Sequence, residues 1–145
     1  LLLTRQDVPV LSGTDDHRAV ACGGYALAEP DSDPDVILIG TGSEVSVALD
    51  AAATLTAAGR SVRVVSMPCT ELFAAQDDAY RDAVLPPGIP TVSVEAGVTF
   101  GWERWADRSV GIDRFGASAP GERVMAELGI TATAVVDAAE SLLTA

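Results

Sequence analysis

The fold is decided by the stretch Val36-Ile37-Leu38-Ile39-Gly40-Thr41-Gly42-Ser43-Glu44-Val45. Its first four residues are apolar and three of them are branched at Cβ, which indicates a strand covered on both faces. A Gly-Thr-Gly turn follows. Apolar residues then recur at a helical spacing, at Val45, Ala48, Leu49, Ala52 and Leu55. A strand, a tight turn and a helix in this order are typical of an α/β protein.

Both ends of this helix carry signals. Thr41 with Glu44 three residues later predicts a capping box, in which each side chain accepts from the other residue's backbone N–H. Gly59 follows the last periodic position and predicts the end of the helix.

A glycine turn before a helix also raises the possibility of an anion site, because backbone N–H groups at a helix start attract phosphate. The pattern here is incomplete: the third glycine of G-x-G-x-x-G is replaced by Val45, and no acidic residue ends the next strand at Ser66-Met67-Pro68. We therefore favour glycines that let the helix pack closely on the sheet. A free-standing α/β binding module with an anion site at Gly40 to Glu44 is kept as the alternative.

On the N-terminal side, residues 20–28 form a short strand broken by Gly23-Gly24. Only the seven residues Glu29 to Asp35 separate it from the strand at Val36, which is too few for a crossover helix. The short strand is therefore predicted to run antiparallel to the Val36 strand, at the edge of the sheet.

On the C-terminal side, strands alternate with helices. Strands are expected at residues 62–67, 91–97 and 109–112, short helical turns at 72–73 and 79–85, and two final helices at 121–128 and 133–143. This alternation predicts a three-layer α/β sandwich whose sheet of about five strands is mostly parallel, with one antiparallel edge strand.

Composition narrows the function classes. The chain has 145 residues, which fits one domain, and a net charge of −12, which argues against nucleic acid or an anionic membrane as partner. Cys22, Cys69 and the single His17 show no metal-ligand spacing. No apolar run reaches the roughly 20 residues that span a bilayer. A reducing, cytoplasmic location is expected, and the absence of an initial Met suggests a fragment of a longer protein.

Few residues are candidates for chemistry. Arg5 follows the apolar Leu1 to Leu3 and would stand at the carboxyl end of a strand, where its planar guanidinium could bind phosphate or carboxylate, although composition alone favours a surface salt bridge. His17 lies in a polar linker, residues 7–20, and is expected to be solvated. Cys69 has no base nearby and is expected to be passive. Glu95, at a strand end, is expected to bond to a nearby loop.

Four of the seven aromatic residues gather near one another in the sequence, at Phe100, Trp102, Trp105 and Phe115. Such a group indicates either a corner of the core or a buried contact with another domain or subunit.

Four blocks of the sequence together resemble the transketolase family over essentially the whole chain, in the family's order. They are Leu3-Thr4-Arg5-Gln6, Gly40-Thr41-Gly42-Ser43-Glu44-Val45, Glu95-Ala96-Gly97-Val98-Thr99-Phe100-Gly101-Trp102 and Gly111-Ile112-Asp113-Arg114-Phe115-Gly116-Ala117-Ser118-Ala119-Pro120. The last block favours transketolase over other thiamine diphosphate enzymes with a similar terminal domain, such as 1-deoxyxylulose-phosphate synthase or a dehydrogenase E1 component.

The resemblance implies a C-terminal α/β domain at residues 20–145, preceded at 1–19 by the end of a pyrimidine-binding domain and a linker. Transketolases are homodimers that move a two-carbon ketol unit between sugar phosphates with thiamine diphosphate and a divalent cation such as Mg²⁺. The family's catalytic, cofactor and metal residues fall outside this segment. Its implied roles are therefore packing and dimer contacts, and substrate-phosphate binding by Arg5, which matches the family's arginine. Alone, the chain is expected to be inactive.

Overall fold

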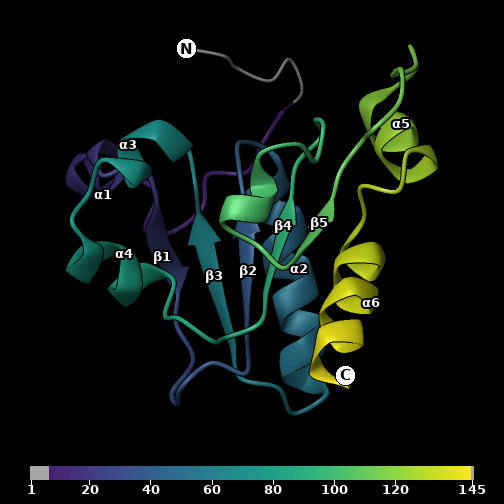
Figure 1. Cartoon of the computed structure of the whole chain (residues 1–145). Coiled ribbons are helices and arrows are strands. Elements are labelled where there is room, and N and C mark those ends of the chain that lie inside the picture. The colour runs from purple at the N-terminus through teal and green to yellow at the C-terminus, as the bar shows by residue number, and fades with distance from the viewer. Residues whose placement is uncertain (1–6, 145) are drawn as a thin grey trace.

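A computed structural model describes residues 7–144, which form one five-stranded sheet with helices on both faces (Figure 1). The strands are β1 (Tyr25–Ala28), β2 (Val36–Gly40), β3 (Val62–Ser66), β4 (Thr91–Val94) and β5 (Arg108–Val110). The helices are α1 (His17–Ala21), α2 (Glu44–Ala57), α3 (Thr70–Ala74), α4 (Asp78–Val84), the 3₁₀ turn η1 (Trp102–Arg104), α5 (Gly121–Glu127) and α6 (Ala132–Leu143).

The strand order is β1-β3-β2-β4-β5, and all neighbouring pairs are parallel except β1 with β3. This confirms the predicted mostly parallel α/β sandwich with one antiparallel edge strand. The four parallel strands end on one side of the molecule, which we call the carboxyl edge of the sheet.

Alternate residues of each strand face opposite layers, which divides the core in two. On one face, Leu38 and Val64 pack with α2 and α6 through side chains such as Leu55 and Val135. On the other face, Ile37, Ile39 and Val65 pack with Phe73 of α3, Val84 of α4 and Trp102 of η1. All five residues of β2 are buried, which confirms that this strand is covered on both sides.

The glycine turn after β2 brings α2 close to the sheet. A Cβ on Gly40 would lie 2.7 Å from the Cα of Val45, a separation that real Cβ atoms do not reach, so only glycine fits there. This supports close helix packing as the role of Gly40. Gly59 ends the helix region with a φ of +89°, as predicted from its position.

As predicted, β1 is an edge strand that runs antiparallel to β2; its hydrogen-bonded neighbour is β3, with Tyr25 opposite Ser66. Two predictions about local structure were wrong. The capping box does not form: Ser43, rather than Thr41, is the residue before α2, and its side chain caps no backbone N–H. The predicted linker contains the short helix α1, which begins after Asp16 because that carboxylate accepts from the N–H of Arg18.

No helix within residues 7–144 combines the length and the apolar character needed to cross a membrane.

Candidate functional site

The cavity whose position best suits ligand binding lies at the carboxyl edge, where neighbouring strands are followed by loops that lead in opposite directions. The strands β3 and β4 lie on opposite sides of β2, so the loops after β2 and β4 lead away from each other. Open α/β sheets bind ligands in the crevice at such a point. A cleft of about 520 Å³ is found there, which we call the strand-end cleft; its lining residues are Thr41, Met67, Pro68, Cys69, Thr70, Glu71, Glu95, Phe100, Gly101 and Trp102.

Glu44, a buried carboxylate, joins the two strand ends beside this cleft. It opens α2 with only 6% of its surface exposed. One carboxylate oxygen accepts from the N–H of Ala96 after β4, at 3.1 Å, and the other accepts from the Ser43 hydroxyl. The side chain therefore bonds across the sheet rather than back to Thr41, which is why the predicted capping box is absent.

The same carboxylate argues against an anion at the glycine turn. Its negative charge already lies at the positive end of the α2 dipole, where a bound anion would be repelled. The N–H groups of Glu44 and Val45 donate within the turn, to the carbonyls of Thr41 and Gly42. The geometry thus gives no support to the alternative of an anion site at Gly40 to Glu44.

Glu95 holds the loop that follows β4. Its carboxylate accepts from the indole Nε1 of the buried Trp102 at 2.8 Å, which confirms that this acid bonds to a nearby loop. Gly101, with a φ of +98°, makes the turn that lets Trp102 fold back under the loop. The indole fills the core, while the preceding Phe100 remains 87% exposed.

Asp113, near the start of the block Gly111 to Pro120, is hydrogen-bonded to the loop that follows β4. Its two carboxylate oxygens accept from the N–H and the hydroxyl of Thr99, each at 2.8 Å. These hydrogen bonds, first from the backbone N–H and then from the hydroxyl, lower the pKa of Asp113 because they stabilise its charged form. The aromatic group found in the sequence is thus split: Trp102 and Trp105 pack with the core, whereas Phe100 and Phe115 face solvent.

Cys69 and Glu71, in the segment after β3, also line the cleft. The Cys69 thiol lies 3.5 Å from a Glu71 carboxylate oxygen, and the Thr70 hydroxyl donates to the same oxygen at 3.3 Å. The pKa of Glu71 is lowered, first by its own backbone N–H and then by Cys69 and Thr70. The partner of the Cys69 thiol is thus a carboxylate rather than a cation, and this supports a passive thiol.

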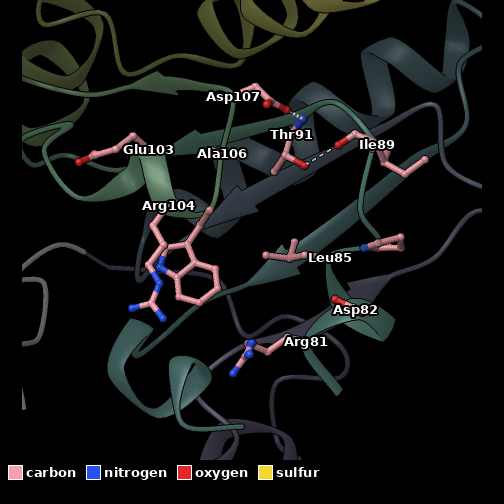
Figure 2. A pocket seen from close by; sticks show the side chains of 12 residues that line it. Arg81, Asp82, Leu85, Ile89, Thr91, Glu103, Arg104, Ala106 and Asp107 are labelled. Atoms are coloured by element: carbon pink, nitrogen blue, oxygen red, sulfur yellow. Dashed lines mark hydrogen bonds between the residues drawn. The ribbon is translucent and has the colours of Figure 1, made fainter. Parts of the chain in front are cut away.

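A second hollow, of about 300 Å³, lies between α4 and the loop from η1 to β5 (Figure 2). The charged groups in its lining make contacts within the domain. Asp107 accepts a hydrogen bond from the N–H of Thr91 at 2.9 Å, and the guanidinium of Arg104 lies 4.6 Å from the centre of the Trp105 ring. Arg81 donates to the carbonyls of Ala74 and Gln76. We interpret this hollow as a structural crevice.

Some of the remaining residues predicted from the sequence lie within the described part of the structure, and others do not. Arg5 and the strand expected at Leu1 to Leu3 lie outside the described residues. His17 is exposed at the start of α1, away from the core, as expected for a solvated side chain. Sequence reasoning missed Glu44 as a tether between strand ends, because its partner Ala96 is 52 residues away and offers only a backbone N–H.

Fold and cleft together define a class: an α/β domain with a mostly parallel sheet and a cleft at the strand ends. Comparison with known proteins gives the family. The model of the family described as "Transketolase-like TK C-terminal domain" matches residues 23–131. The chain belongs to the transketolase family, as its C-terminal domain.

Known transketolases are similar to this protein along almost the whole chain. It is 53% identical over 150 residues to "Transketolase 7" of Craterostigma plantagineum, covering 98% of this chain and 22% of the relative. It is 48% identical over 148 residues to "Transketolase, chloroplastic" of Solanum tuberosum, covering 98% and 20%. The structure of "Transketolase from Leishmania mexicana" superposes with a TM-score of 0.91 at 46% identity, covering 97% and 20%. The chain thus spans about a fifth of the length of these relatives.

Proposed function

We propose that the full-length protein is a transketolase, which transfers a two-carbon ketol unit from a ketose phosphate to an aldose phosphate. The observation that carries this proposal is the identity of about one half to transketolases along nearly all of the chain. The matched 98% of the chain extends beyond the core to the surface loops that carry Phe100 and Phe115.

Thiamine diphosphate and a divalent cation such as Mg²⁺ are the cofactors that this function requires, but the residues described here do not fit them. No group of three His, Cys, Asp or Glu side chains within residues 7–144 could hold a metal ion. The described lining of the strand-end cleft includes Glu71 and Glu95 and no basic residue, so it repels a diphosphate. We therefore propose that parts of the enzyme outside this chain bind both.

Within this chain, we propose that Arg5 binds the substrate phosphate, because a guanidinium offers two parallel hydrogen bonds and a permanent charge. Residues 1–19 would then complete the preceding pyrimidine-binding domain and its linker, and residues 20–145 would form the C-terminal domain that supplies packing and dimer contacts. A cytoplasmic homodimer is the assembly proposed.

The test uses the purified full-length enzyme with a ketose phosphate and an aldose phosphate. Ketol transfer is expected only when thiamine diphosphate and Mg²⁺ are both present, and removal of either by dialysis against a chelator should abolish it. An enzyme that is folded and loaded with both cofactors but transfers no ketol group between any pair of sugar phosphates would contradict the proposal.

A further inference from the structure

An uncharged cavity of about 200 Å³ lies between the chain that precedes β1 and the turn that starts α2. One side is formed by side chains within residues 8–20, and the other by Tyr25 of β1, Ser66 of β3, Pro68 and side chains within residues 42–46. No acidic or basic side chain is among its described lining residues, although the chain carries a net charge of −12. We call it the linker cavity, because part of the predicted linker forms one of its sides.

Two buried hydroxyl groups reach the linker cavity. Tyr25 and Ser66 are each 7% exposed, and they lie opposite each other on the adjacent strands β1 and β3, so their side chains leave the sheet on the same face. Neither hydroxyl makes a hydrogen bond within residues 7–144, whereas the side-chain N and O atoms that are fully removed from solvent there all have partners. Both hydroxyl oxygens therefore reach open space, and the cavity that both residues line provides it.

These two hydroxyls decide which molecules fit. The hydroxyls of Thr14, Ser43 and Ser46 also line the cavity, but each already donates a hydrogen bond within the protein. Tyr25 and Ser66 are left to donate to a ligand and to accept from it. Most of the remaining lining is apolar, and a charged ligand would lose its hydration without meeting an opposite charge. The lining therefore suits a small uncharged molecule with an apolar body and one polar side.

We propose that the linker cavity binds a small uncharged molecule that consists of an apolar ring and a hydroxyl or carbonyl oxygen, and that this oxygen forms hydrogen bonds with Tyr25 and Ser66. A cavity of about 150 Å³ is large enough for a benzene ring, so a single six-membered ring fits here. Water could satisfy the two hydroxyls but would leave the apolar lining hydrated, whereas a ring would cover it. This site goes beyond the proposed function and does not depend on it.

A molecule in this cavity would contact the linker and the body of the domain at the same time. Within residues 7–144, the backbone of residues 7–14 makes one hydrogen bond, the local one from the N–H of Thr14 to the carbonyl of Leu11. Side-chain contacts, including those around the cavity, therefore hold this segment on the domain. Binding is expected to strengthen its attachment and to protect it from proteases.

The first experiment measures the binding of phenol to the full-length enzyme by isothermal titration calorimetry. Tyr25→Phe and Ser66→Ala each remove one hydroxyl from the cavity, and each should weaken binding by roughly three- to tenfold, the value of one hydrogen bond. Tyr80→Phe is the matched control: its hydroxyl donates to the carbonyl of Gly24 at 2.9 Å, outside the cavity lining, so the affinity should stay unchanged. A wild type that binds no phenol, or Tyr25→Phe and Ser66→Ala variants that bind it as tightly as the wild type, would overturn the proposal.

The second experiment tests the absence of charge. Benzoate and benzylammonium resemble phenol in size but carry opposite charges at neutral pH. Both should bind at least tenfold more weakly than phenol, because the lining offers neither a cation nor an anion as partner. An ion that competes for the same site with the affinity of phenol would show that the cavity is not a site for uncharged molecules.

The third experiment places the bound molecule beside the linker. Cleavage by elastase within residues 7–14 of the full-length enzyme should be slowed roughly tenfold by phenol at ten times its Kd, since cleavage requires the segment to leave the cavity. At the same concentration, Tyr25→Phe should show a slowing of only about two- to fourfold. A short peptide substrate of elastase checks that phenol does not inhibit the protease. A cleavage rate in the wild type that does not respond to bound phenol would refute binding at this site.

Discussion

Glu44 is a carboxylate that is nearly removed from solvent, and three features of its surroundings make that tolerable. It lies at the positive end of the α2 dipole, it accepts from the N–H of Ala96, and it accepts from the Ser43 hydroxyl. A buried charge without such partners would be costly. The residue thereby fixes the turn after β2 relative to the loop after β4, and both of these segments contribute to the lining of the strand-end cleft.

Glu44→Gln should lower the free energy of unfolding by about 1 to 2 kcal/mol, because the amide oxygen can still accept from Ala96 but the charge that strengthens the bond is gone. Urea unfolding of the 145-residue chain, followed by tryptophan fluorescence, measures the change. Glu122→Gln, an exposed acid in the first turn of α5, is the control and should stay within about 0.5 kcal/mol of the wild type. A smaller effect at Glu44 than at Glu122 would show that the tether does not stabilise the fold.

The lowered pKa of Asp113 leads us to expect a specific dependence of the free energy of unfolding on pH. Its pKa in the folded protein is lowered, so its contribution is present above the ordinary pKa of Asp and is lost as the pH falls through the lowered value. The stability difference between wild type and Asp113→Asn should therefore be constant from pH 7 to about 5 and shrink below about pH 4. Urea midpoints measured between pH 3 and 7 test this, with Asp137→Asn as an exposed control on α6. A difference that grows as the solution is acidified would have the wrong sign.

Arg5→Ala in the full-length enzyme should lower kcat/KM for sugar phosphates by roughly ten- to a hundredfold, because a charge-assisted bond to phosphate is worth about 1.5 to 3 kcal/mol. The loss should be much smaller for a substrate without phosphate. Arg123→Ala, an exposed arginine on α5, is the control. Unchanged steady-state kinetics with sugar phosphates would remove Arg5 from the site.

At the scale of elements, β1 shows where local signals stop being informative. The sequence predicts its direction and its edge position, but the seven residues from Glu29 to Asp35 do not say which strand it pairs with. Seven extended residues reach roughly 23 Å, whereas two strand spacings need only about 10 Å, so the connection can pass β3 and leave β1 on its far side. The pairing is set by tertiary contacts instead, among them Arg63 of β3 with Glu29 at 2.8 Å.

Gly23, just before β1, offers a test of this attachment. Its φ is +83°, and an added Cβ would lie 2.4 Å from the carbonyl oxygen of Cys69 and from the backbone nitrogen of Phe73. Gly23→Ala should therefore cost more than the roughly 1 to 2 kcal/mol of a left-handed alanine, because the backbone of α3 must also move. Gly59→Ala is matched in backbone conformation, with a φ of +89° and no atom near the added Cβ, and should cost only the smaller amount. Equal losses in urea unfolding would mean that β1 and α3 are not held as closely as described.

For the whole molecule, patterns of one or two elements predict the architecture well. Continuous apolar strands such as Val36 to Ile39, alternating with amphipathic helices, leave few arrangements other than a parallel sheet covered on both faces. The bonds that shape the cleft join Glu44 to Ala96 and Thr99 to Asp113, and no local pattern encodes such pairs. Arg5 was assigned from its expected position at a strand end together with the family resemblance, and it stays a prediction.

The 145-residue chain alone should show no ketol transfer, even with thiamine diphosphate and Mg²⁺ added in excess. Transfer requires groups that move protons and hold a diphosphate, and within residues 7–144 the strand-end cleft presents carboxylates that are already bonded to Trp102, Cys69 and Thr70. A coupled assay with a ketose phosphate and an aldose phosphate measures the rate, with the full-length enzyme at equal molar concentration as the positive control. Turnover that rises in proportion to the concentration of the 145-residue chain, and persists through a further purification step, would mean that this domain holds catalytic groups of its own.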